Sequence, residues 1–166
     1  VDNFVIIPTY EWQFTPQVED ADFTKIAKKA GLEAEAARLL FERGIQDEAS
    51  LERFLAPSLE NLHDPYLLHD MDKAVERIRQ AIEQGELILV YGDYDADGMT
   101  SASIVKESLE QLGAECLVYL PNRFTDGYGP NASVYKYFIE QQGVSLIVTV
   151  DNGVAGHEAI ALAQSM

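Results

Sequence analysis

The hydrophobic pattern changes its period after residue 86, and this change excludes most fold classes. Leu87–Tyr91 is a continuous apolar run, and two similar runs follow at residues 116–120 and 145–150. Runs of this length are typical of strands that are buried on both faces of a parallel sheet. Segments with helical spacing separate the runs. The pattern therefore predicts an α/β fold with a doubly wound, mainly parallel sheet.

Helix signals follow each predicted strand. A helix is expected at residues 100–112, and another is expected to begin after Asn131, a good N-cap, and to end at Gly143. A last helix starts near Gly156. Ligands of doubly wound sheets bind at the carboxyl ends of the strands. The residues that directly follow the three apolar runs are therefore the first candidates for a site.

A small helical region precedes the predicted sheet. One helix is expected from Asp22 to Gly31, a second from Glu33 to Gly44, and a third after Asp47. Glycine supplies the left-handed residue at a helix end, and aspartate is a good N-cap.

A connector marked by Pro57 and Pro65 separates this region from a helix at residues 70–84, which Asp70 is expected to cap. We therefore divide the chain into an amino-terminal segment with a helical module, residues 1–69, and the beginning of an α/β domain, residues 70–166.

Composition limits the classes of function. The 166 residues include one cysteine, Cys116, so an internal disulfide is excluded, and we expect a cytoplasmic protein without membrane contact. The formal net charge of −16 argues against a sequence-independent DNA-binding protein, because lysine and arginine supply most non-specific affinity for phosphates. That objection weakens if the carboxylates gather around divalent cations.

An acidic motif follows the first predicted strand directly. Asp93, Asp95 and Asp97 alternate along it, and Gly98 is expected to let the backbone turn. Like charges this close repel one another unless a cation lies among them, and a hard divalent ion is the usual partner of carboxylates. Thr100 is expected near the helix amino end, where an anion can bind. A solvated acidic loop is the simpler interpretation. It is disfavoured because the acidic motif follows a buried strand so closely.

Two other classes of site share parts of this motif. An EF-hand loop also has Asp at its first, third and fifth positions, but here its twelfth position is Ile104 instead of a bidentate Glu, and a strand precedes the loop. A phosphatase with an aspartyl nucleophile also has Asp after a buried strand. Met99 stands where the haloacid-dehalogenase pattern has Thr or Val, so this phosphatase stays only as a weak alternative.

The other two strand ends carry polar residues as well. After the second strand, Asn122, Arg123, Tyr128 and Gly129 are candidate substrate-binding residues, since a guanidinium fork suits phosphate and an aromatic ring can stack on a base. Asp151 follows the third strand. Parallel strands end at the same edge of a sheet, so Asp151 is expected close to the acidic motif.

Four carboxylates at one sheet edge indicate a two-metal hydrolase, in which the ions lie about 4 Å apart. The candidate metal ligands are Asp93, Asp95, Asp97 and Asp151, and the candidate catalytic residues are Asp95, Asp97 and Asp151.

Motifs of the three strand ends, residues 93–98, 121–129 and 150–153, resemble those of the DHH phosphoesterase superfamily in order and in strand context. The upstream segments 54–59 and 70–75 resemble the branch of single-strand-specific exonucleases within it. The resemblance covers nearly the whole chain. It implies hydrolysis of single-stranded DNA from the 5′ end with Mn²⁺ or Mg²⁺, in DNA repair and recombination.

The same resemblance implies roles for particular residues. The four aspartates match metal-site carboxylates of the superfamily, and which of Asp93, Asp95 and Asp97 bind directly stays open. Arg123 matches a phosphate contact. Single-stranded DNA is the expected partner of a monomeric enzyme, and repair or replication proteins are further candidate partners.

One departure from the superfamily pattern is large. The Asp-His-His signature of the superfamily is not within the 166 residues, so we expect an incomplete sheet and no activity from this chain alone. Oligoribonuclease, cyclic-dinucleotide phosphodiesterase and pyrophosphatase activities remain alternatives within the superfamily. A non-catalytic homologue that binds a protein partner is an alternative of another class.

Overall fold

The computed structural model describes residues 10, 24–25 and 28–166. Contacts divide the chain into two compact units, Val1–Asp64 and Pro65–Met166. The domain boundary predicted at residues 69–70 stays a prediction. In the described part of the chain, no helix is long and apolar enough to cross a membrane.

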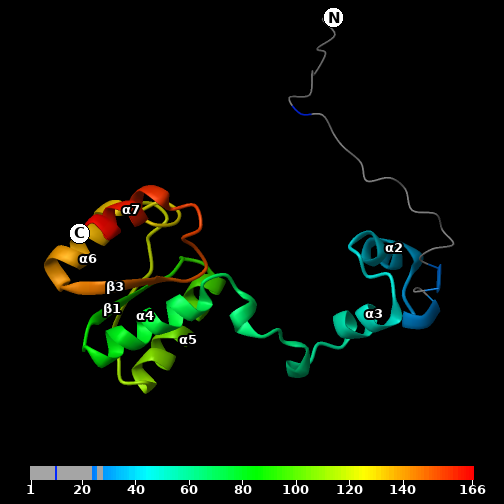
Figure 1. The fold of residues 1–166 in the computed structure, drawn as a ribbon. Coiled ribbons are helices and arrows are strands. Elements are labelled where there is room, and N and C mark those ends of the chain that lie inside the picture. Colours follow the sequence, from blue (N-terminus) through cyan, green and yellow to red (C-terminus); the bar gives the residue numbers. More distant parts are fainter. Residues whose placement is uncertain (1–9, 11–23, 26–27) are drawn as a thin grey trace, which may run out of the picture. The chain divides into compact units, whose positions relative to one another are not determined.

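The first unit includes the helices α2 (Ala34–Glu42) and α3 (Glu48–Leu55) (Figure 1). Both were expected from the sequence, whereas the predicted start of an earlier helix at Asp22 lies outside the described residues. Asp47 caps α3 through a capping box, in which its carboxylate accepts a 2.9 Å hydrogen bond from the Ser50 N–H. The helices share a small apolar core formed by Ala37 and Leu51 with Ala30, Leu40, Phe41 and Ile45.

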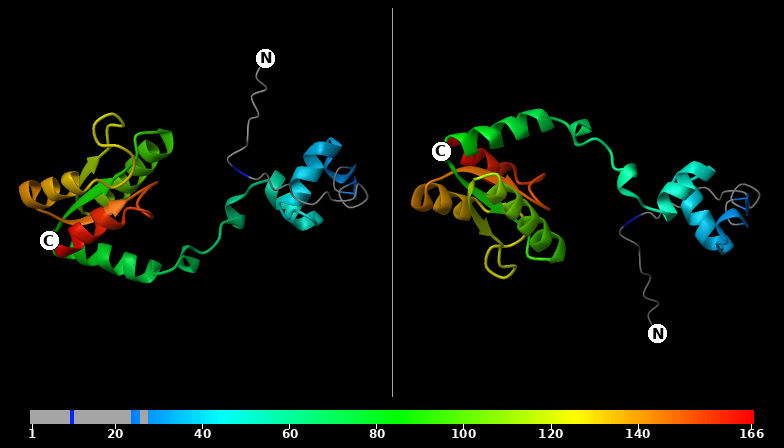
Figure 2. Two further views of the ribbon diagram at one scale, coloured as in Figure 1. Left: turned by 90° about the horizontal axis from the view of Figure 1, so that it is seen from above. Right: turned by 90° about the horizontal axis from the view of Figure 1, so that it is seen from below.

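The connector carries two 3-10 helices, η1 (Leu59–Asn61) and η2 (Pro65–Leu67), and then leads into α4 (Met71–Glu83) (Figure 2). Asp70 is the N-cap residue of α4, as predicted, but its side chain does not form a capping hydrogen bond. Its backbone is left-handed, with φ 57°. Its carboxylate instead accepts from the Lys73 ammonium at 2.8 Å, so an ion pair replaces the capping hydrogen bond.

The second unit contains a parallel sheet of three strands, β1 (Leu87–Tyr91), β2 (Glu115–Tyr119) and β3 (Val144–Thr149). Their order is β2-β1-β3, so β1 is central. All three strands lie within one residue of their predicted ends. Tyr91 pairs with Tyr119 on one side and with Thr149 on the other, so the three carboxyl ends lie at one edge.

Helices cover both faces of this sheet, which confirms the predicted doubly wound α/β class. Besides α4, the helices are α5 (Ala96–Gln111), α6 (Ala132–Gln142) and α7 (His157–Ser165) (Figure 1). Because successive side chains of a strand point to opposite faces, β1 contributes to two cores. Ile88 and Val90 pack with α4 and α5, while Leu89 and Tyr91 pack with α6 and α7.

Helix α5 begins four residues before its predicted start. The Asp95 carboxylate accepts a 3.0 Å hydrogen bond from the Gly98 N–H and so caps the helix, which then starts at Ala96. Asp97 and Gly98 therefore lie in the first helical turn. Thr100, expected near an anion at the amino end, lies further along, and its hydroxyl donates to the Ala96 carbonyl at 2.7 Å.

Candidate metal and phosphate site

Three carboxylates meet at the carboxyl edge of the sheet. Asp93 follows β1 after one glycine, Asp95 caps α5, and Asp151 follows the end of β3. One oxygen from each of the three residues lies within 4.8 Å of the others. Three carboxylate oxygens at this spacing match the ligands that hard divalent cations prefer.

Asp93 is the buried member of this cluster. Its side chain is buried, with 2% of the residue exposed, and one of its oxygens accepts a 2.7 Å hydrogen bond from the Tyr94 N–H. Buried carboxylates need compensation by hydrogen bonds or cations. Among the described residues, the Asp93 carboxylate accepts this one hydrogen bond, so a cation is a suitable further partner for its charge.

Gly98 has a different role from the one expected. A Cβ at this position would lie 2.5 Å from the backbone N and O and from the Cβ of Asp93. Gly98 therefore does not serve to let a loop turn. It allows the first turn of α5 to pack directly on Asp93, because any larger residue would overlap with it.

Asp151 has two features that are typical of a constrained site. Its φ of 60° is a left-handed conformation that residues other than glycine rarely adopt. Desolvation raises the pKa of the Asp151 carboxyl, and the negative charges of Asp95, Asp97 and Asp93 raise it further. The cluster repels itself without a cation.

The neighbouring Asn152 supplies a further acceptor. Its amide nitrogen donates to the Val150 carbonyl at 3.0 Å, while its buried oxygen accepts no hydrogen bond from any residue that the structure describes. An unpartnered buried acceptor next to mutually repelling carboxylates fits a bound cation and its coordinated water. The donor set of this edge therefore suits a divalent metal.

Asp97 is not part of the group of three carboxylates whose oxygens lie within 4.8 Å of one another. It lies in the first turn of α5, is exposed, and acts on Asp151 only through its charge. The structure thus brings together Asp93, Asp95 and Asp151 of the four candidates, and metal binding by Asp97 stays a prediction.

The loop after β2 is organised by Asp126, to which the sequence assigned no role. Its carboxylate accepts from the Asn122 N–H and from the Tyr119 hydroxyl, both at 2.7 Å. These hydrogen bonds hold the pKa of Asp126 below its usual value. The Asn131 amide donates to the Asp126 carbonyl at 3.0 Å, so the loop is closed against the start of α6.

Arg123 lies on the loop after β2, beside the acidic cluster. It lines a cleft of about 640 Å³ together with Asn122, Tyr94 and Asp95. The Arg123 guanidinium carbon lies 4.5 Å from the centre of the Tyr94 ring, which makes a cation–π contact. Tyr94 was missed in the sequence because a tyrosine between two aspartates carries no signal of its own.

The remaining candidates of this loop are Tyr128 and Gly129. Tyr128 is exposed, and its ring makes an edge-to-face contact with the Tyr94 ring, with 6.3 Å between centroids. Gly129 is buried, and its carbonyl accepts a 3.0 Å hydrogen bond from the Tyr91 hydroxyl. Both residues line a second cleft of about 530 Å³, which Asp151 and Asn152 share.

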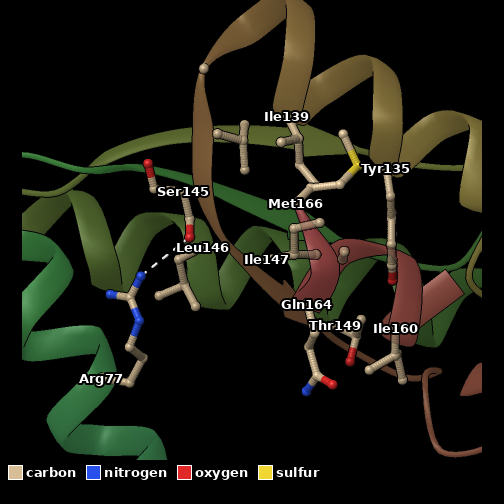
Figure 3. Close-up of a pocket in the computed structure, with 13 residues that line it drawn as sticks. Arg77, Tyr135, Ile139, Ser145, Leu146, Ile147, Thr149, Ile160, Gln164 and Met166 are labelled. Atoms are coloured by element: carbon tan, nitrogen blue, oxygen red, sulfur yellow. Dashed lines mark hydrogen bonds between the residues drawn. The ribbon is translucent and has the colours of Figure 1, made fainter.

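A larger cavity of about 860 Å³ lies along β3 and contains none of the four carboxylates (Figure 3). Figure 3 shows Arg77 donating to the Ser145 carbonyl, at 3.2 Å, at one side of this cavity. Its lining combines aliphatic side chains, such as Ile139, Ile147 and Ile160, with polar ones, such as Arg77 and Gln164. None of the residues that line this cavity is an Asp, Glu, His or Cys, so the cavity offers no carboxylate, imidazole or thiolate to a metal ion.

Comparison with known proteins matches part of this chain to a family. Residues 87–166 match the DHH family, N-terminal domain. The single-stranded-DNA-specific exonuclease RecJ of Bacillus subtilis (strain 168) is 45% identical over 124 residues, which are 74% of this chain and 16% of that protein. The RecJ of Escherichia coli (strain K12) is 38% identical over 130 residues, 78% of this chain and 22% of that protein.

Solved structures agree with this match. A crystal structure of exonuclease RecJ bound to manganese aligns with a TM-score of 0.55 and 31% identity, covering 60% of this chain and 25% of that one. RecJ from Thermus thermophilus in complex with Mn²⁺ aligns with a TM-score of 0.56 and 26% identity, covering 87% of this chain and 19% of that one. The chain spans only 16% and 22% of the two curated relatives named above. Residues 87–166 therefore belong to the DHH family, N-terminal domain.

Proposed function

We propose that this chain is part of a metal-dependent exonuclease that hydrolyses phosphodiester bonds of single-stranded DNA from the 5′ end, in DNA repair and recombination. The observation that carries the proposal is the meeting of Asp93, Asp95 and Asp151 within 4.8 Å. These residues lie in a segment that matches the DHH family, within a chain that is 45% identical over 124 residues to a single-stranded-DNA-specific exonuclease.

The proposed cofactor is Mn²⁺ or Mg²⁺, held here by Asp93, Asp95 and Asp151, with Asp97 beside them. Two such ions would activate water and stabilise the departing oxygen. Manganese is supported by the relatives, whose structures contain it. The chain's own contribution is a rigid set of oxygens, because Asp93 is buried and Asp95 is held by the amino end of α5.

The proposed substrate contacts lie on the loop after β2. Arg123 offers a planar fork for a phosphate, and Asn122, Tyr128 and Gly129 border the two clefts beside the carboxylates. Exposed rings at Phe124 and Tyr128 are suited to stacking on unpaired bases. We propose a cytoplasmic, monomeric enzyme with single-stranded DNA as substrate and with repair or replication proteins as further partners.

Digestion of a 5′-labelled single strand by the full-length protein tests the proposal. We expect release of mononucleotides with Mn²⁺, and loss of at least about a hundredfold in turnover for Asp95→Asn and for Asp151→Asn, because each variant replaces a charged metal-binding carboxylate by a neutral amide. Glu107→Gln is the matched control, since Glu107 is an exposed carboxylate on α5. Turnover retained in both aspartate variants at saturating Mn²⁺ would contradict the metal assignment.

The same assay separates the alternatives. A preference for short oligoribonucleotides, a cyclic dinucleotide or pyrophosphate over single-stranded DNA would favour another DHH-family activity. A full-length protein that binds Mn²⁺ but hydrolyses none of these substrates would favour a non-catalytic homologue.

A further inference from the structure

Tyr94 lies between two carboxylates in sequence, yet its ring contacts a cation. Asp93 and Asp95 flank it, and both belong to the cluster at the sheet edge. The Tyr94 ring lies beneath the Arg123 guanidinium at 4.5 Å. One residue therefore connects the metal-binding motif to the loop that carries the candidate phosphate contact.

The way in which Arg123 is held determines what it can bind. Within the described residues, no ion pair or hydrogen bond of its guanidinium is found, although Asp95 lines the same cleft. A ring contacts the face of a guanidinium, whereas a carboxylate occupies the N–H groups at its edge. The tyrosine thus orients Arg123 and leaves the planar set of donors free.

Tyr94 is itself held on two sides. Its N–H donates to the Asp93 carboxylate at 2.7 Å, and its ring meets the Tyr128 ring edge to face, at 70° and with 6.3 Å between centroids. The contacts of the ring with Tyr128 and Arg123 join the segment after β1 to two positions of the loop after β2. A ring fixed in this way reduces the rotamer freedom that Arg123 must lose when it binds an anion.

From these contacts we propose that Tyr94 is a positioning residue, which holds Arg123 away from the neighbouring carboxylates and presents its N–H groups to a phosphate of the single strand. This inference rests on the proposed function. It assigns a role in substrate alignment to a residue of the metal-binding motif that is not one of its ligands.

The test compares Tyr94→Leu and Tyr94→Phe in the full-length protein. Removing the ring should raise KM for a single-stranded oligonucleotide about three- to thirtyfold, the range of a partly desolvated cation–π contact, with kcat and Mn²⁺ affinity unchanged. Phenylalanine keeps the ring face and should stay within about twofold of wild type. Tyr137→Leu, at an exposed tyrosine of α6, is the matched control.

A double-mutant cycle with Arg123→Ala distinguishes positioning from a general structural role. If Tyr94 acts through Arg123, Tyr94→Leu should change KM by less than about twofold once Arg123 is alanine. An equal effect in both backgrounds, a loss of Mn²⁺ affinity, or a Tyr94→Leu variant with the KM of wild type would overturn the inference.

Fluorescence anisotropy with the same oligonucleotide separates this inference from the proposed function. If wild type binds the strand without cutting it, the proposed hydrolysis fails, while the coupling between Tyr94 and Arg123 is still read from the dissociation constants. A wild-type protein that neither binds nor cuts the strand overturns both.

Discussion

At the scale of single residues, the carboxylate cluster depends on a neighbour that carries no charge. Gly98 lies in the first turn of α5, where a Cβ would overlap with the backbone of Asp93. Asp93 is almost fully buried, so it has little room to move. The position of the Asp93 carboxylate therefore depends on the absence of a side chain at position 98 of the adjacent helix.

Gly98→Ala should damage both stability and metal binding. We expect the free energy of unfolding to fall by about 1 to 3 kcal/mol, because an added methyl group must displace Asp93 or the start of α5. Thermal or urea unfolding measures this loss, and calorimetry with Mn²⁺ measures the affinity.

Ser103→Ala is the control for Gly98→Ala, since Ser103 is an exposed residue of the same helix and should change stability by less than about 0.5 kcal/mol. An alanine at position 98 with the stability and Mn²⁺ affinity of wild type would show that the approach of α5 to Asp93 is not required.

At the scale of elements, the side chain of one residue, Asn131, links the loop after β2 to helix α6. The Asn131 side-chain oxygen accepts from the Ser133 N–H at 2.9 Å and from the Val134 N–H at 3.2 Å. Its amide nitrogen donates to the Asp126 carbonyl. Asn131 therefore starts the helix and closes the loop that carries Arg123.

Replacing Asn131 by alanine should lower the free energy of unfolding by about 1 to 2 kcal/mol, as expected for loss of an N-cap. Asn131→Asp keeps the acceptor for the helix but loses the donor to Asp126. It should therefore retain most of the stability while weakening oligonucleotide binding by the full-length protein. Urea unfolding and anisotropy measure the two effects. Equal losses of stability in both variants would assign the effect to the loop instead of the cap.

At the scale of the whole molecule, the charge is strongly unbalanced. The chain has 28 acidic and 12 basic residues, which gives a formal net charge of −16. Such an excess destabilises the folded state through self-repulsion. Cations that screen or bind this charge should stabilise the protein.

We expect Mn²⁺ to raise the Tm of the 166-residue chain more than NaCl of equal ionic strength does. At about ten times its Kd, a bound ion adds about 1.4 kcal/mol, which corresponds to a Tm shift of about 3 to 6 °C. Scanning calorimetry measures the shift, and a chelator should reverse it. Asp151→Asn should abolish the Mn²⁺-specific part while its own Tm without metal stays equal or rises, because one like charge is gone. A Tm that responds equally to Mn²⁺ and NaCl would speak against a specific metal site.

The sequence by itself determined the α/β class, the three strands and the edge at which the site lies. These features follow from local patterns: a buried parallel strand needs a continuous apolar run, and Asn131 and Gly143 mark the ends of α6 by capping chemistry that involves only near neighbours. The acidic motif and Asp151 could be assigned to one edge because parallel strands end together.

Only the tertiary structure decided which side chains meet there. The start of α5 depends on the Asp95 cap, and the earlier start puts Asp97 on the helix, outside the group formed by Asp93, Asp95 and Asp151. Likewise, the contact of Tyr94 with Arg123 joins residues from two strand ends. Contacts of this kind depend on distances of a few ångström between segments far apart in the chain, and no periodicity of the sequence encodes them.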